Sequence, residues 1–150
     1  MNDWKRILIA VDQSQTSIKA LSYTADITSN LSDAELCLLY IYPEPPPNYY
    51  SSGGSLSDYQ QQKTAAAEVI FQNSMELLEK YALGEKVTTR CKMADHITIS
   101  QAVLEVQAEG KFGTVVVGKR GVSKAEEFLF GSISNGIVHH CHDFTVWVVG

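Results

Sequence analysis

The sequence alternates short apolar runs with segments of helical periodicity, and this alternation constrains its fold more than any other feature. Residues 5–11, 34–42 and 113–117 are continuous apolar runs of strand length. Unbroken runs of this kind are typical of strands that are buried on both faces of a parallel sheet. Between the first two runs, Ile18, Leu21 and Ala25 are spaced for one face of a helix. We therefore expect strands and helices to follow one another along the chain.

The rest of the chain continues the alternation. Residues 86–93 repeat at a period of two, with Val87, Thr89, Cys91 and Met93 on one face. This pattern predicts an outer strand with one side partly exposed. Further helices are expected over about 58–81, 99–108 and 131–142, and a last strand over 144–149. The resulting order predicts right-handed crossovers and a doubly wound parallel α/β sheet.

Composition limits the domain count and the class of partner. A chain of 150 residues, 45% of them hydrophobic, fits one domain that buries roughly 70% of its unfolded surface. The net charge of −5 argues against nucleic acid or an anionic membrane as partner, since phosphate affinity depends on clustered Lys and Arg.

The charged N-terminus precedes only a short apolar run, so we expect neither a signal peptide nor a spanning helix. We therefore expect a cytoplasmic location. The three cysteines form no C-x-x-C pair and are expected to be reduced.

All four prolines fall within residues 43–57, between the second strand and the following helix. Because proline can neither donate to a sheet ladder nor continue a helix, this segment is predicted to be a long loop. Tyr49 and Tyr50 favour the interpretation that this loop is a lid that covers a site, whereas the Gly- and Ser-rich remainder favours a flexible segment. Both interpretations stay open. Ser57 is the expected N-cap of the helix that follows.

Polar residues follow the first strand, and glycines follow the fourth. In an open parallel sheet, ligands bind beyond the carboxyl ends of the strands, where the winding reverses direction. Asp12 ends the first strand, and Ser14 and Ser17 place hydroxyls where its helix begins. Gly118 and Gly121 follow the fourth strand, can adopt positive φ angles and have no Cβ, so their N–H groups can approach a phosphate closely.

A second glycine element opens the last helix. Gly131 and Ser132 stand where unpaired N–H groups and the positive end of the helix dipole favour an anion. Ser132 and Ser134 can add hydroxyl donors, and positive charge comes from Lys119, Arg120 and Lys124. Together these residues predict a phosphate cradle. In the alternative interpretation, the glycines only make a tight turn and the serine only caps a helix.

The spacing within this cradle resembles a family signature. The motif G-x-x-G-x9-G-S is formed by Gly118, Gly121, Gly131 and Ser132 and is followed by Ile133 and Ser134. It resembles the ATP-binding signature of the universal stress protein family. The turn through Asp12, Ser14, Ser17 and Ala20 is similar to the D-x-S-x-x-S-x-x-A turn of the same family. The resemblance covers nearly the whole chain.

The resemblance implies a single-domain, Rossmann-like three-layer α/β/α sandwich with strand order 3-2-1-4-5, and a homodimer paired through the last strand, Thr145–Val149. It also implies ATP between the ends of the first and fourth strands. Asp12 and the backbone of Ile41 would face the adenine and ribose. The ribose and phosphates would be lined by Gly118, Arg120 and Gly121, and the phosphates held by Gly131, Ser132, Ile133 and Ser134. Mg²⁺ would accompany ATP, bound mainly by phosphate oxygens and water.

Two positions depart from the family pattern. Gln13 stands where the family often has glycine, which predicts a bulkier first turn and a weaker or shifted nucleotide grip. Thr145 stands where the family often has proline before the last strand. A dimeric scaffold that leaves the cradle empty is therefore the alternative to an ATP-binding signalling module. No general base stands out in the cradle, so an enzyme is not expected, with slow ATP hydrolysis as a further alternative.

Two histidine motifs have simpler interpretations than catalysis or metal binding. His139, His140 and His142 cannot all converge on one ion from such close helical positions, and we interpret them as a helix C-terminus. Asp95 and His96 precede a helix and resemble a cap with its neighbour.

Overall fold

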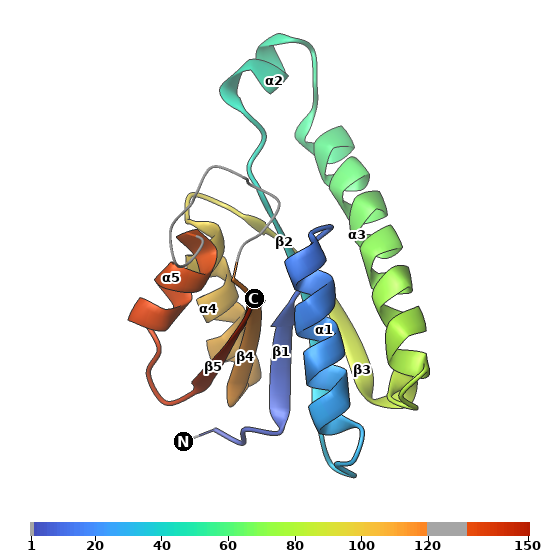
Figure 1. Cartoon of the computed structure of the whole chain (residues 1–150). Coiled ribbons are helices and arrows are strands. Elements are labelled where there is room, and N and C mark those ends of the chain that lie inside the picture. Colours follow the sequence, from blue (N-terminus) through green and yellow to red (C-terminus); the bar gives the residue numbers. More distant parts are fainter. Residues whose placement is uncertain (1, 120–131) are drawn as a thin grey trace.

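The computed structural model of the chain, which describes residues 2–119 and 132–150, is built around a five-stranded parallel sheet (Figure 1). Its strands are β1 (Arg6–Ala10), β2 (Glu35–Pro43), β3 (Val87–Ala94), β4 (Thr114–Gly118) and β5 (Thr145–Val149). They lie in the order β3-β2-β1-β4-β5, and every neighbouring pair is parallel. The expected doubly wound fold and the strand order 3-2-1-4-5 are therefore confirmed.

Helices cover both faces of this sheet (Figure 1). α1 (Gln15–Thr28) and α3 (Leu56–Glu79) pack on one face, and α4 (Ile99–Gly110) and α5 (Ser132–His139) pack on the other. A short 3-10 helix, η1 (Gly84–Lys86), leads into β3. Within residues 2–119 and 132–150, no helix combines the length and the hydrophobicity that crossing a bilayer requires.

The central strands are apolar at successive positions because both faces of the sheet are covered. In β1, Ile7 and Ile9 pack in the cluster under α1 and α3, whereas Leu8 packs in the cluster under α4 and α5, and all three are fully buried. Leu38 and Leu39 repeat this alternation in β2. β3 lies at the edge of the sheet, as predicted for an outer strand, but its side chains are exposed at successive positions over 88–91, on both faces and not on one side alone.

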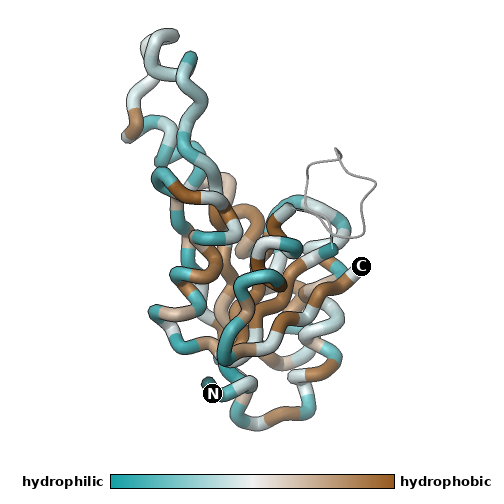
Figure 2. Tube along the Cα trace, turned by 90° about the vertical axis from the view of Figure 1, so that its left-hand side faces the viewer, coloured by the Kyte–Doolittle hydropathy of each residue, from teal (hydrophilic) through white to brown (hydrophobic). Residues whose placement is uncertain are grey.

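Residues 44–55 form an arm that rises beyond the carboxyl ends of the strands (Figure 1) and is mostly hydrophilic or neutral (Figure 2). The prediction that residues 43–57 form a loop is wrong in part, because Pro43 is the last residue of β2, the arm includes α2 (Pro47–Ser51), and α3 begins at Leu56. Proline is tolerated at the first helical position, where its missing N–H would have no partner within the helix. The expected cap is also wrong: Ser55, not Ser57, is the N-cap of α3 and accepts the Asp58 N–H at 3.1 Å.

Tyrosine rings join the arm to the body of the molecule. The ring centroid of Tyr59 on α3 lies 5.4 Å from that of Tyr49 and 5.9 Å from that of Tyr42. The Tyr59 hydroxyl donates to the carbonyl oxygen of Pro43 at 2.6 Å. Gly54 lies against the same group, since a Cβ there would stand 2.5 Å from the ring of Tyr49. These contacts define the position of the arm, and its role as a lid stays a prediction.

Candidate functional site

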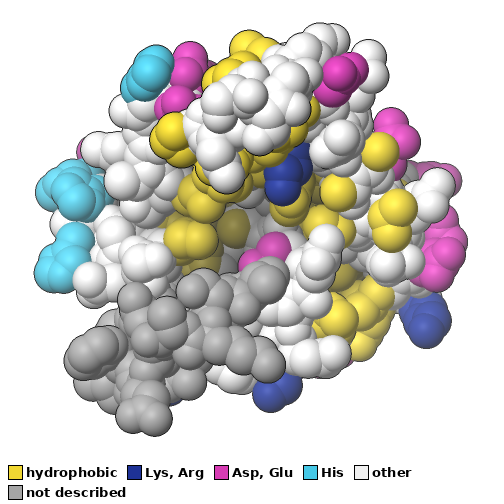
Figure 3. Space-filling view, turned by 90° about the horizontal axis from the view of Figure 1, so that it is seen from above, with side chains coloured by type: hydrophobic (Ala, Val, Ile, Leu, Met, Phe, Trp, Pro, Cys, Tyr) yellow, Lys and Arg dark blue, Asp and Glu magenta, His cyan; other side chains and the backbone are white. Residues whose placement is uncertain are grey.

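The site expected from the sequence lies where the winding of the sheet reverses. β1 pairs with β2 on one side and with β4 on the other. The chain leaves β1 toward the face covered by α1, and it leads from β4 to α5 on the opposite face. The connections diverge at the carboxyl ends, and in open α/β sheets the crevice between two such strands is the usual place for a ligand. Figure 3 looks onto this edge and shows a hollow near its middle, bordered by hydrophobic side chains and an acidic one.

The turn after β1 holds its polar side chains in a network of hydrogen bonds. Ser14 N–H donates to Asp12 Oδ1 at 2.7 Å, and Asp12 N–H donates to Ser17 Oγ at 2.9 Å. Ser14 is also the N-cap of α1, because its Oγ accepts the Ser17 N–H at 3.1 Å. The D-x-S-x-x-S spacing therefore builds the first turn of α1. It places the half-buried Asp12 at the edge of the crevice.

β2 contributes Tyr40 and Ile41, which lie on opposite faces of the sheet. Burial raises the pKa of the Tyr40 hydroxyl, and the Cys91 thiol and the Asp12 carboxylate raise it further. The phenol therefore stays protonated at neutral pH and offers a neutral hydrogen-bond donor near Asp12. Ile41 is half-buried and packs against the cluster under α4 and α5, as Ile133 of α5 does.

Gly118 is required by the packing of α1. It is the last residue of β4, opposite Val149, and among the described glycines only Gly53 has a positive φ. Gly118 therefore does not use the positive φ angle that glycine permits. A Cβ at this position would lie 2.9 Å from Thr16 Oγ1 and 3.2 Å from the Thr16 carbonyl carbon. The missing Cβ lets the first turn of α1 approach the end of β4.

The start of α5 is joined to the end of β4, as expected for two walls of one site. Ser134 Oγ donates to the carbonyl oxygen of Lys119 at 3.2 Å, and Ser134 is only 1% exposed. Lys119 N–H in turn donates to the Val149 carbonyl oxygen at 2.6 Å. Ser132 is exposed at the first position of the helix, where its hydroxyl can reach a ligand.

Three of the predicted site residues, Arg120, Gly121 and Gly131, lie outside the described residues. Contacts join some of the others through neighbouring residues. The turn that contains Asp12 meets Gly118 through Thr16, and Lys119 meets α5 through Ser134. The structure therefore brings the two sequence motifs to the same end of the sheet.

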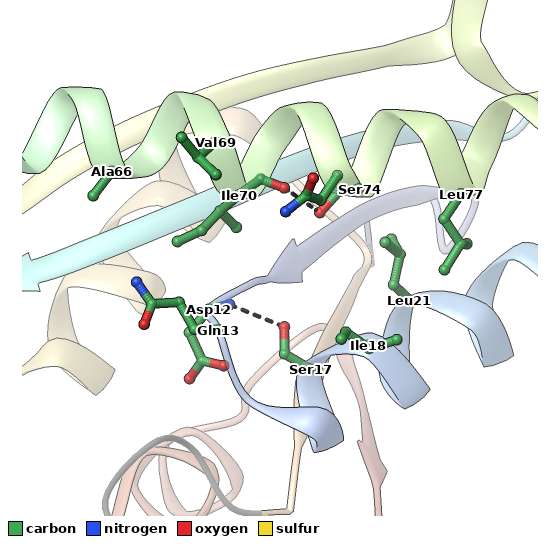
Figure 4. Close-up of a pocket in the computed structure, with 11 residues that line it drawn as sticks. Asp12, Gln13, Ser17, Ile18, Leu21, Ala66, Val69, Ile70, Ser74 and Leu77 are labelled. Atoms are coloured by element: carbon green, nitrogen blue, oxygen red, sulfur yellow. Dashed lines mark hydrogen bonds between the residues drawn. The ribbon is translucent and has the colours of Figure 1, made fainter.

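A cavity of about 470 Å³ opens beside the crevice, between α1 and α3 (Figure 4). Asp12, the exposed Gln13 and Ser17 line the end of the cavity that follows β1. The remaining lining residues come from the two helices and are mostly apolar: Ile18, Leu21, Ala66, Val69, Ile70, Asn73, Ser74 and Leu77. Helical periodicity placed Ile18 and Leu21 on one face of a helix, but only Leu21 is buried, and Ile18 is 47% exposed. The periodicity could not show that the two helices stand far enough apart to leave a space.

The histidines near the C-terminus lie at the end of α5, in agreement with their interpretation from the sequence. The helix ends at His139, and the ring Nδ1 of His140 lies 2.9 Å from the carbonyl oxygen of Gly136. The described residues place this group at the opposite end of α5 from Ser132, away from the crevice.

Asp95 and His96 do not cap α4, which corrects the sequence interpretation. The N-cap is Thr98, which forms a reciprocal capping box with Gln101 and so satisfies the first backbone donors of the helix. Asp95 and His96 instead cluster with Glu44 at the base of the arm. The imidazole nitrogens of His96 lie 3.5 Å from the Asp95 carboxylate and 3.6 Å from that of Glu44.

The strand order and the crevice at its switch point define a doubly wound α/β protein of the type that binds ligands at the carboxyl edge of its sheet. More specifically, the model of the universal stress protein family matches residues 3–150, and the chain belongs to this family.

Solved structures of the family have the same fold. The universal stress protein UspA from Lactobacillus plantarum superposes with a TM-score of 0.79 at 16% identity, over 99% of this chain and 100% of that chain. A universal stress protein in complex with cAMP gives 0.71 at 17% identity, over 97% of each chain. One from Archaeoglobus fulgidus in complex with dAMP gives 0.64 at 13% identity, also over 97% of each chain. A sequence search of curated proteins finds no significant match.

We predict that Gly118→Ala destabilises the protein, because the new Cβ meets both the side chain and the backbone of Thr16. Overpacking of this kind lowers the free energy of unfolding by about 1–3 kcal/mol, which urea denaturation can measure. Gly84→Ala is the matched control, since its Cβ would meet only the flexible side chain of Glu79, at 3.3 Å. Wild-type stability in the Gly118 variant would contradict the packing role of this glycine.

Proposed function

We propose that this universal stress protein holds ATP, with Mg²⁺, in the crevice between the ends of β1 and β4. The observation that carries the proposal is the hydrogen bond from Ser134 to Lys119, which joins the start of α5 to the end of β4. A helix N-terminus at the carboxyl edge of a parallel sheet is a favourable place for phosphate groups. The resemblance of the glycine motif to an ATP signature supports the same ligand. The cAMP and dAMP complexes of two structural relatives support an adenine nucleotide.

Different residues of the proposed site bind different parts of the nucleotide. Asp12 and the backbone of Ile41 contact the adenine and ribose, and the phosphates lie against the glycine motif: Gly118, Arg120, Gly121, Gly131, Ser132, Ile133 and Ser134. Because the Ser134 hydroxyl donates to the protein backbone, Ser132 is the hydroxyl better placed to bind phosphate. Hydroxyl and backbone N–H donors suit an anion, and Mg²⁺ then takes phosphate oxygens and water as its main ligands.

Binding without rapid turnover fits the described residues best. His96 lies at the base of the arm, and the other histidines follow the C-terminal end of α5, so no described histidine stands beside Ser132 as a general base. Asp12 accepts a hydrogen bond from its own turn and is proposed to face the sugar. We infer a stress-response signalling module that changes its shape or its partner according to the nucleotide that it binds. We expect slow ATP hydrolysis at most.

Ser132→Asp is predicted to weaken MgATP binding by at least about tenfold, because a carboxylate at the start of α5 repels the phosphates. Isothermal titration calorimetry with excess Mg²⁺ measures this change. Gln72→Glu adds the same charge at an exposed position of α3 and should bind ATP as the wild type does. If the wild type has no ATP affinity in the micromolar to millimolar range, the proposal fails and the scaffold alternative is favoured.

We further propose a homodimer that pairs through β5. This strand is at the edge of the sheet, and its hydrophobic residues are only half-buried: Val146, Trp147, Val148 and Val149. Thr145 N–H donates to the Gly113 carbonyl oxygen at 2.9 Å, so Thr145 directs its backbone groups toward β4. Because successive residues of a strand alternate, Val146 and Val148 direct theirs to the open edge. Unpaired backbone groups of this kind are a template for a second strand.

Val146→Pro is predicted to convert the dimer into a monomer, because it removes an N–H that faces the open edge but leaves the bonds to β4 in place. Val146→Ala is the matched control, since it loses the same side-chain packing but keeps the N–H, and it should remain dimeric. Sedimentation velocity separates the two states. A monomeric wild type, or a dimeric proline variant, would contradict pairing through this edge.

A further inference from the structure

We propose that the cavity between α1 and α3 is a second ligand site, which takes a small amphiphile with an aliphatic body and a cationic head, such as a primary alkylamine. The cavity lies on the α1 and α3 face of the sheet, whereas the glycine motif leads to α5 on the other face. The two sites share Asp12, but neither needs the other to be occupied.

The cavity has the size and lining of a small-molecule site. Its volume of about 470 Å³ lies within the range of pockets that hold organic ligands. Figure 4 shows Leu21 of α1 facing Leu77 of α3, with Ile70 further along α3 on the side of Asp12 and Gln13, and all three line the space between the helices. An aliphatic chain in this space would be removed from water by apolar side chains on both sides, which is the main source of affinity for such a ligand.

The side chains at the mouth leave the cavity open. Ile18 and Val69 are 47% and 57% exposed, so two large hydrophobic side chains border the opening in the free chain. Ala66 is too short to reach α1. Ser74 is also short, and its hydroxyl donates to the Ile70 carbonyl oxygen at 2.8 Å, so it is satisfied without a ligand. Exposed apolar side chains gathered around a concave surface are typical of a binding site.

The polar end of the cavity favours a cation. Asp12 is the one ionisable side chain among the residues that line it, and Gln13 and Asn73 add neutral amides. Asp12 Oδ1 accepts the Ser14 N–H, while Oδ2 accepts no hydrogen bond from the described residues. An ammonium group can therefore bind the carboxylate directly, whereas an anionic head group would be repelled.

Three ligands of one chain length test the proposal: octylamine, octanol and octanoate differ only in their head groups. Each is titrated into nucleotide-free protein and followed by the ¹³C-methyl NMR signals of Ile18, Leu21, Ile70 and Leu77. We expect shifts at these methyls and octylamine affinity at least about fivefold above that of octanoate. Shifts that map to other parts of the chain, or octanoate binding as tight as octylamine binding, would overturn the proposal.

Two variants test separately how the charge of Asp12 and the apolar space contribute to ligand binding. Asp12→Asn keeps the oxygen that accepts the Ser14 N–H, and it should remove the advantage of octylamine over octanol. Ala66→Trp fills the cavity and should abolish the binding of both ligands, whereas Ala65→Trp, at the exposed neighbouring position, should not. Unchanged octylamine binding in a folded Ala66→Trp variant would overturn the site. Because ATP binding is measured separately, either proposal can fail without the other.

Discussion

The parallel pairing of β1 with β4 is the contact on which the rest of the structure depends. It aligns Leu8 with Val115 and Ile9 with Val116, and all four side chains are fully buried. The chain winds in opposite directions from this pair, so α1 covers one face of the sheet and α5 the other. The same reversal opens the crevice at the carboxyl edge. The buried core and the position of the candidate site therefore have one cause.

Close packing shapes the walls of this crevice. Gly118 admits the first turn of α1 through its contact with Thr16, and Gly136 admits α4, since a Cβ there would stand 2.5 Å from Ser100 Oγ. Gly118, which belongs to the phosphate motif in the sequence, thus also allows a helix to approach closely. A substitution at Gly118 tests the fold as well as the ligand, and Ser132 is the cleaner probe of binding.

Much of the fold could be predicted because it depends on local patterns. Continuous apolar runs identify strands covered on both faces, and the D-x-S-x-x-S spacing indicates the turn after the first strand in which Asp12 lies. The predicted helix starts and caps were wrong where more than one neighbouring residue could serve as the start or the cap of the same helix. Pro47 starts a helix instead of preventing one, and Ser55 caps α3 in place of Ser57. Thr98 caps α4 because its capping box with Gln101 satisfies two donors at once. The partner of Gly118 and the cavity beside Asp12 depend on distances between segments far apart in sequence, which no local pattern contains.

We propose that the crevice between β1 and β4 holds an adenine nucleotide. Native mass spectrometry of freshly purified protein, supplied with MgATP, tests it most directly. We expect chains that each carry one ATP, and release of that ATP when the protein is denatured. Chains that show only the mass of the bare polypeptide under these conditions would contradict it.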